Sequence, residues 1–328
     1  MSAPLLPAPR QGFTLIEMLA AIAVLAVLVL MIVQITDGTA RSVTHENRQI
    51  DTDTEARMIF NRLALDFARM LKRPDLDYAS FKQPAGVLPA RYRDADGKPV
   101  PVPANLQPGN DRMAFYSESR GSFPGSSQPT GEARSPVSVI GYQIVPDPAT
   151  GTPGLGRRSI GLGWEPEAGG AWKSVAHLPV RLDEAWSDLF SDATAFPGVA
   201  DSVFRLEYLY LLKPHGNKAA RLSLVPWNDD PGLTPPHTAV DGFRDVAAII
   251  VTIALLDRHA SALVHDYTVL ASALPDAAAD ADGNAQGVAA AWGAIVRGAG
   301  FAEKVGIPPV AAAGIRIYER HFPLDSNP

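Results

Sequence analysis

The stretch that decides the fold lies at the start of the chain: Gly12-Phe13-Thr14-Leu15-Ile16-Glu17, followed by the apolar run Met18–Val33. From Phe13 to Ile35 the only ionisable side chain is that of Glu17. The run contains no Pro or Gly, and its many Leu and Ala residues favour a helix. Because a bilayer core needs about 20 apolar residues in helical form, the run is long enough to cross one. A carboxylate inside such a segment is unfavourable, so Glu17 is a candidate functional residue.

The residues before this run form a short leader. Residues 1–12 carry one charged side chain, Arg10, and three prolines that prevent the helix from extending backwards. A secretory signal peptide has its cleavage site behind the apolar core. Here no Ala-x-Ala site is isolated behind the run by a polar break, so we expect processing ahead of the run and a mature protein that keeps it.

The residues Gly12, Phe13 and Glu17 in this arrangement resemble the type IV prepilin family. Its signature is a short polar leader ending in Gly, then an aromatic residue, with Glu at the fifth mature position. The resemblance implies that a prepilin peptidase cuts between Gly12 and Phe13 and methylates the new amine of Phe13. It also implies that Glu17 serves assembly by pairing with the N-terminal ammonium of a neighbouring subunit. The alternative is a plain signal anchor with a Glu near its end.

Composition limits the classes of function that remain. The chain has 328 residues, a formal net charge of −6 and no cysteine. The acidic balance argues against general nucleic-acid binding, which needs a basic surface. Without cysteine there is no disulfide framework, no thiol chemistry and no Cys-based zinc site. Beyond the helix, roughly 250 residues are left, which is enough for one large domain.

The sequence predicts four segments. They are a cleaved leader at 1–12, a transmembrane helix at 13–35, an amphipathic stalk helix at 36–73 and a periplasmic, β-rich head with long loops at 74–328. We expect the stalk helix to end near Lys72, ahead of Pro74. One apolar stripe on it comprises Ile59, Leu63, Phe67 and Met70. The opposite, polar surface comprises Arg57, Arg62, Asp66, Arg69 and Lys72.

Apolar patterns in the head predict strands and short helices. The strands are Arg112–Ser117, Val137–Val145, Arg157–Trp164, Val203–Leu212, Val246–Leu256 and Gly314–Phe322. The alternation in Val203–Leu212 predicts a half-buried strand, and the continuous run in Val246–Leu256 a central strand buried on both faces. Short helices are expected at Glu184–Phe190, 258–272 and Val288–Gly298. The fold class is therefore α+β, with a long N-terminal helix packed on one antiparallel sheet, as in type IV pilins.

The order of segments from Met113 to Leu256 resembles the J-type minor pseudopilins of type II secretion and related minor pilins. The likeness rests on the strand Val203–Leu212, a later Trp227 and the apolar strand Val246–Leu256. The long Pro/Gly loops and the added C-terminal region depart from that pattern.

No catalytic motif is recognisable in the sequence. A Gly-x-Ser-x-Gly elbow, a phosphate loop and a His-Glu-x-x-His pair are all missing. His259 and His265 lie near Asp257 and Asp266, but we interpret all four as solvated polar residues. A weak calcium candidate comprises Asp280, Asp282 and Asn284, because calcium binds carboxylate and carbonyl oxygens on a Gly-bent turn. The alternative is a polar turn, and no other cofactor is expected.

The leading hypothesis is a non-enzymatic minor pilin or pseudopilin. It would lie in the bacterial inner membrane as a single-pass protein with its head in the periplasm. Its partners would be prepilin peptidase, other pilins through the N-terminal helix, and the inner-membrane assembly platform. The fibre would be a type II secretion pseudopilus or a type IV pilus tip, and an adhesive or DNA-uptake minor pilin would share the same fold. The alternative class is a membrane-anchored enzyme or carbohydrate-binding module.

Overall fold

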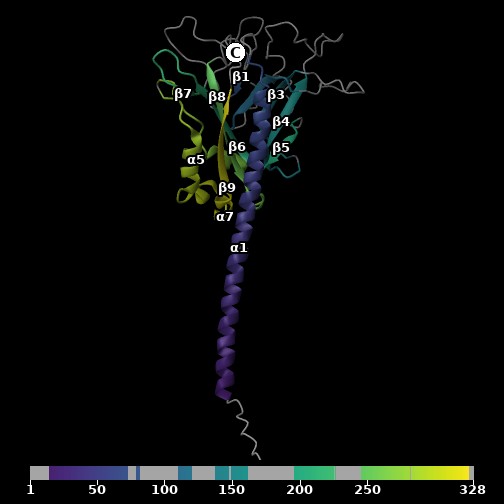
Figure 1. The fold of residues 1–328 in the computed structure, drawn as a ribbon, viewed down its shortest axis with the longest axis vertical. Helices are drawn as coiled ribbons and strands as arrows, with labels where there is room; N and C mark the ends of the chain where they lie inside the picture. Colours follow the sequence, from purple (N-terminus) through teal and green to yellow (C-terminus); the bar gives the residue numbers. More distant parts are fainter. Residues whose placement is uncertain are drawn as a thin grey trace, which may run out of the picture. The chain divides into compact units, whose positions relative to one another are not determined.

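The computed structural model describes residues 15–72, 79–81, 110–119, 137–147, 149–161, 196–224, 226, 245–280 and 282–324. The chain divides into two compact units, Met1–Ile50 and Asp51–Pro328. Figure 1 shows the elements in sequence colours. The helices are α1 (Leu15–Ala68), α3 (Arg258–Ser261), α4 (Tyr267–Ser272), α5 (Val288–Arg297), α6 (Phe301–Val305) and α7 (Pro309–Ala313). The strands are β1 (Ala79–Phe81), β2 (Arg112–Ser117), β3 (Ser138–Pro146), β4 (Pro153–Gly161), β5 (Gly198–Asp201), β6 (Val203–Leu212), β7 (Arg221–Ser223), β8 (Val246–Leu256) and β9 (Ile315–Pro323).

The α+β fold class is confirmed, with one correction to the sheet. The described strands form two antiparallel sheets, in the orders β1-β2-β3-β4-β5 and β7-β6-β8-β9, where the sequence predicted one. The break falls between β5 and β6 at Ser202, which has a left-handed backbone with φ of 63°. A single non-glycine residue in that conformation redirects the chain sharply. Strand β5 therefore stays on the edge of the first sheet, while β6 enters the second beside β8.

The helix α1 ends earlier than predicted. Its last residue is Ala68, four positions before Lys72. Met70 instead forms a bridge with Ser117, and the Leu71 N–H donates to the Tyr116 carbonyl at 2.9 Å. The last residues of the predicted helix thus pair with the end of β2, because their backbone groups find partners there rather than in another helical turn.

The predicted apolar stripe on α1 is confirmed, and it lies in the main core. Ile59, Leu63, Phe67 and Met70 are all buried and pack against side chains of both sheets. The Phe67 ring lies 5.2 Å from that of Phe115 in β2 and 5.1 Å from that of Phe322 in β9. One helix face therefore holds the two sheets together through direct aromatic contacts.

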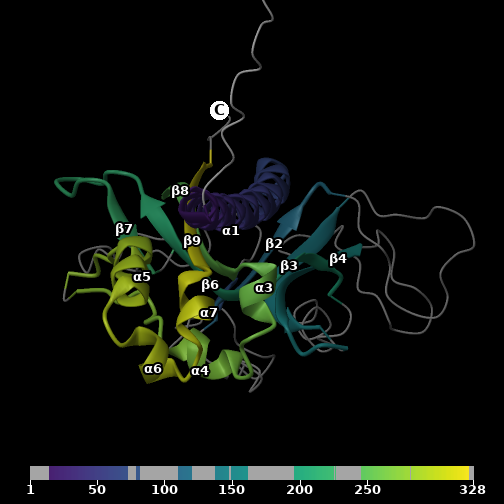
Figure 2. The ribbon, with the colours of Figure 1, turned by 90° about the horizontal axis from the view of Figure 1, so that it is seen from below.

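The prediction that β6 is half-buried was wrong, because a second core covers its other face. The sequence predicted a half-buried strand, but both faces of β6 are buried. Figure 2 shows the C-terminal part of α1 on one side of β8 and β9, and helices α5, α6 and α7 on the other. These helices bring Trp292 and Phe301 onto the second face of the sheet. Helices α6 and α7 and the short strands β5 and β7 were not predicted.

This second core also buries two charged residues of β6. Arg205 is fully buried, and its guanidinium donates to Asp276 and lies 3.4 Å from the Glu207 carboxylate. The same guanidinium sits 5.1 Å from the centre of the Trp292 ring. Arg205 and Glu207 were the reason for predicting a half-exposed strand. They are instead paired beneath the C-terminal helices, because a buried charge needs a partner.

The return strand β4 begins earlier than the predicted Arg157–Trp164. Its first residues, from Pro153 to Gly156, pair with β3, and the turn before them is held by the Asp147 carboxylate. A Cβ on Gly154 would lie 2.6 Å from the Ala200 carbonyl oxygen of β5. Glycine at 154 therefore allows the close approach of β5. The predicted helix at Glu184–Phe190 and residue Trp164 lie outside the described residues.

The predicted helix at 258–272 is two short helices. Asp257 accepts from two N–H groups at the start of α3, and Asp266 does the same for α4. Each aspartate is an N-cap, and the second cap begins a new helix where the sequence predicted a continuous one. Helix α5 and strand β9 agree with their predictions to within one residue at each end.

A buried carboxylate on α1 fixes the helix to the first sheet, which corrects the placement of Asp66 on the polar surface. Asp66 is only 2% exposed and forms a two-point ion pair with Arg157 of β4, at 2.6 and 3.0 Å. It also accepts from the hydroxyl of Tyr142 in β3. Burial and the Asp66 charge raise the pKa of Tyr142, so the phenol keeps its proton and remains a donor.

Replacing Asp66 should destabilise the head strongly. Asp66→Ala leaves the Arg157 side chain, which is 12% exposed, without its partner, so we expect a loss of about 3–5 kcal/mol in the free energy of unfolding. The control is Arg62→Ala, which removes an exposed partner 3.6 Å from the same carboxylate and should cost less than about 1 kcal/mol. Denaturant unfolding of the full chain in detergent measures both values. Equal losses would contradict the role assigned to Asp66.

A second carboxylate on α1, Glu55, lies beside the end of β5. Burial and the negative charge of Asp201 raise its pKa from 4.5 to about 7, against the opposing effects of the Asp201 N–H and Arg258. A raised pKa means that the folded protein binds the proton more tightly than the unfolded chain. The stabilisation from this proton is complete below about pH 4.5 and is lost as the pH rises through about 7.

Glu55→Gln should therefore flatten the pH dependence of stability. The variant cannot become charged, so we expect it to be more stable than the unmodified chain above pH 7 and little different near pH 4.5. The control is Asp51→Asn, on the exposed face of the same helix. Unfolding midpoints across this pH range test the prediction, which fails if the difference between variant and parent does not grow with pH.

Candidate functional site

The N-terminal part of α1 has the length and composition of a membrane span. Among the described residues, one helical stretch qualifies by these criteria, the 22 residues Leu15–Thr36, and none of it is buried within the chain. At 1.5 Å per residue it measures about 33 Å, close to the roughly 30 Å of a bilayer core. Large apolar side chains are exposed all round it. A helix that is apolar all round needs an apolar environment.

Glu17 lies in the first turn of this helix. A carboxylate there interacts favourably with the N–H groups that point out of the helix N-terminus. Its side chain is exposed in the single chain. Glu17 therefore lies on the anchor helix, four residues after the position at which cleavage would create a new end. Gly12 and Phe13 lie outside the described residues, so the predicted cleavage and methylation remain predictions.

The α1 surface opposite the buried stripe carries its own apolar side chains. Ile50, Met58 and Leu65 are 59%, 54% and 57% exposed. They follow each other at spacings of eight and seven residues, about two helical turns, and so lie on one side of the helix. Leu65 is about 200° round the helix from the buried Leu63. Met58 and Leu65 of this second stripe face away from the head's own core.

The weak calcium candidate forms a closed polar turn. The Asp280 carboxylate accepts from the N–H groups of Asp282 and Asn284 and from the Asn284 side-chain amide. These donors lower the pKa of Asp280. A carboxylate already engaged by three donors of its own turn is poorly placed to ligate a cation, which favours the polar-turn interpretation.

The histidine and aspartate candidates around α3 and α4 do not form a common site. Asp257 and Asp266 cap different helices, and no group of three or more His, Cys, Asp or Glu suited to a metal occurs in the part of the chain described here. The charged residues that matter most to the head, Asp66 and Arg205, were missed by sequence reasoning. For Asp66 a signal existed, because it follows Leu63 by three residues and so lies at the edge of the stripe.

Comparison with known proteins adds one finding. Residues 8–33 match the family model described as the prokaryotic N-terminal methylation motif. This match includes Gly12, Phe13 and Glu17 and the whole apolar run Met18–Val33. No curated protein and no solved structure matches the chain. The chain thus carries a prepilin-type N-terminal methylation motif on an apolar helix, and its architecture of a long helix and antiparallel sheets is type IV pilin-like.

Proposed function

We propose that this chain is a minor pilin or pseudopilin subunit. Prepilin peptidase cleaves it between Gly12 and Phe13 and methylates the new amine of Phe13. The segment Leu15–Thr36 anchors it in the bacterial inner membrane, and the head lies in the periplasm. The observation that carries the proposal is the methylation motif at residues 8–33, with Glu17 in the first turn of an exposed apolar helix.

Glu17 provides the assembly contact in this proposal. The ammonium group of a neighbouring subunit, exposed by cleavage, pairs with its carboxylate inside the bundle of anchor helices. Two unit charges about 4 Å apart attract by about 4 kcal/mol at an effective dielectric constant near 20. Because a carboxylate is unfavourable in hydrocarbon, an attraction to the ammonium group lowers its cost there, and the contact favours the assembled state.

The second apolar stripe of α1 extends this contact beyond the membrane. Met58 and Leu65 lie on the side of the helix that the head leaves uncovered. Exposed apolar side chains at this spacing suit packing against another helix. The subunit then joins a type II secretion pseudopilus or a type IV pilus tip through one continuous helix, with the inner-membrane assembly platform as a partner. No step of this role requires catalysis by the head.

Processing is tested by co-expression with a prepilin peptidase. We expect the mature chain to lack residues 1–12 and to carry one added methyl group on Phe13. Intact-protein mass spectrometry with N-terminal sequencing of the membrane-extracted protein measures both. Gly12→Leu, which places a bulky side chain at the scissile bond, should leave the leader in place. A mature chain that begins with Met1, or one cut behind residue 35, would rule the proposal out.

Assembly is tested separately by Glu17→Gln. We expect the variant to be inserted in the membrane but lost from sheared fibres, because the neutral amide no longer attracts the ammonium group. The matched control is Glu118→Gln, which removes an exposed carboxylate from the head. Immunoblots of membrane and fibre fractions compare the two variants. If Glu17→Gln enters fibres as well as the control does, the assembly contact is elsewhere.

A further inference from the structure

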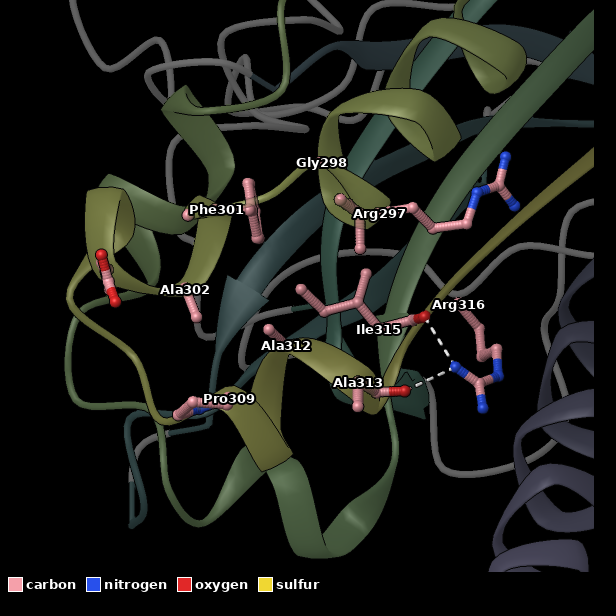
Figure 3. Close-up of a pocket in the computed structure, with 12 residues that line it drawn as sticks. Arg297, Gly298, Phe301, Ala302, Pro309, Ala312, Ala313, Ile315 and Arg316 are labelled. Atoms are coloured by element: carbon pink, nitrogen blue, oxygen red, sulfur yellow. Dashed lines mark hydrogen bonds between the residues drawn. The ribbon is translucent and has the colours of Figure 1, made fainter.

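A pocket opens in the C-terminal helices of the head. It has a volume of about 410 Å³ and lies between the end of α5, helices α6 and α7, and the first residues of β9. Figure 3 shows the side chains that line it. Ligand pockets in proteins typically measure about 300–1,000 Å³, so this one is large enough for a small apolar group and the part of the ligand next to it.

The inner wall of the pocket is apolar and firmly held. Phe301 and Ile315 are 5% exposed and belong to the second core, and Ala312 contributes a small side chain beside them. Helix α6 ends at Val305, with Gly306 as its C-cap, and α7 begins at Pro309, so two short helices frame one side. A wall built on the core keeps its shape without a ligand.

The rim of the pocket carries both signs of charge. Arg297 and Arg316 contribute cations, and Glu303 contributes one anion. Figure 3 shows both guanidinium groups on the same side of the pocket, across from Phe301 and Pro309. Arg316 donates to the carbonyl oxygens of Ala313 and Ile315 at 2.7 and 3.0 Å, which fixes its direction.

The region is basic within an acidic protein. Residues 287–316 contain Arg297, Lys304 and Arg316 against Glu303, a net charge of +2, whereas the whole chain carries −6. A local positive region around an apolar wall attracts a partner that presents a carboxylate next to an apolar group. The charge of these residues therefore favours a ligand that carries a carboxylate beside an apolar group.

We propose that this pocket binds an extended peptide segment of a partner protein. An apolar side chain of the segment packs against Phe301 and Ile315, and an adjacent carboxylate pairs with Arg297 and Arg316. Glu303 accepts a backbone N–H or a basic side chain of the same segment. The anionic Glu303 disfavours polyanions such as nucleic acid or an anionic lipid headgroup, whereas a peptide supplies both signs of charge. The site belongs to the head alone and does not depend on processing after Gly12.

Two labelled peptide pools test this proposal on the full chain in nanodiscs. Both pools consist of short, end-blocked random peptides with a fixed central pair, Phe-Asp in one and Phe-Asn in the other. Fluorescence anisotropy should show tighter binding of the Phe-Asp pool. Arg297→Gln should weaken that binding about fivefold, as expected for loss of one exposed ion pair. Lys304→Gln, an equal change of charge on α6 outside the pocket lining, should have little effect at physiological salt.

A second variant tests the cavity itself. Ala312→Phe places a ring in the pocket and should abolish binding of both pools. Val310→Phe adds the same ring at an exposed position of the same helix outside the lining and should not. Unfolding midpoints establish that each variant is folded, and Arg297→Gln gives an independent result if Ala312→Phe is not. Equal binding of the two pools, binding unaffected by Arg297→Gln and by Ala312→Phe, or binding only to anionic lipid vesicles would overturn the proposal.

Discussion

One face of a single helix holds this head together. The stripe from Ile59 to Met70 buries its side chains against both sheets, and Phe67 touches an aromatic ring in each. At the edge of that stripe the Asp66 carboxylate is paired with Arg157 and Tyr142 of the first sheet. The apolar stripe supplies most of the buried area, and the directional contacts of Asp66 fix the helix at one position on the sheet.

The second sheet is the middle layer of the head. Its β8 strand is apolar on both faces, and α1 covers one face while the C-terminal helices cover the other. Such a strand is stable only when both faces are covered. The C-terminal helices therefore complete the core, and their outer surface carries the pocket for which we propose a peptide ligand. The C-terminal helices that cover Arg205 thus form a surface outside the N-terminal motif.

The helix α1 has different neighbours along its length. From Leu15 to Thr36 it is exposed and apolar, as a membrane-spanning segment is. From Asp51 onward one side is covered by the head, while Met58 and Leu65 remain exposed on the other. An exposed apolar segment and an uncovered apolar side on the same helix agree with the proposed role in a fibre. Glu17 is the one charged side chain along the anchor, which is why the proposed subunit contact centres on it.

Local chemistry in the sequence determined the N-terminal motif, the anchor helix, the α1 stripe and the strands β2, β6 and β8, because hydrophobic periodicity and unbroken apolar runs are local signals. Only the tertiary structure decided that the strands split into two sheets at Ser202 and that Asp66 and Arg205 are buried. A charged side chain looks the same in sequence whether water or a distant partner covers it. The partners of these two, Arg157 and Asp276, lie 91 and 71 residues away, so no pattern near either residue contains the contact.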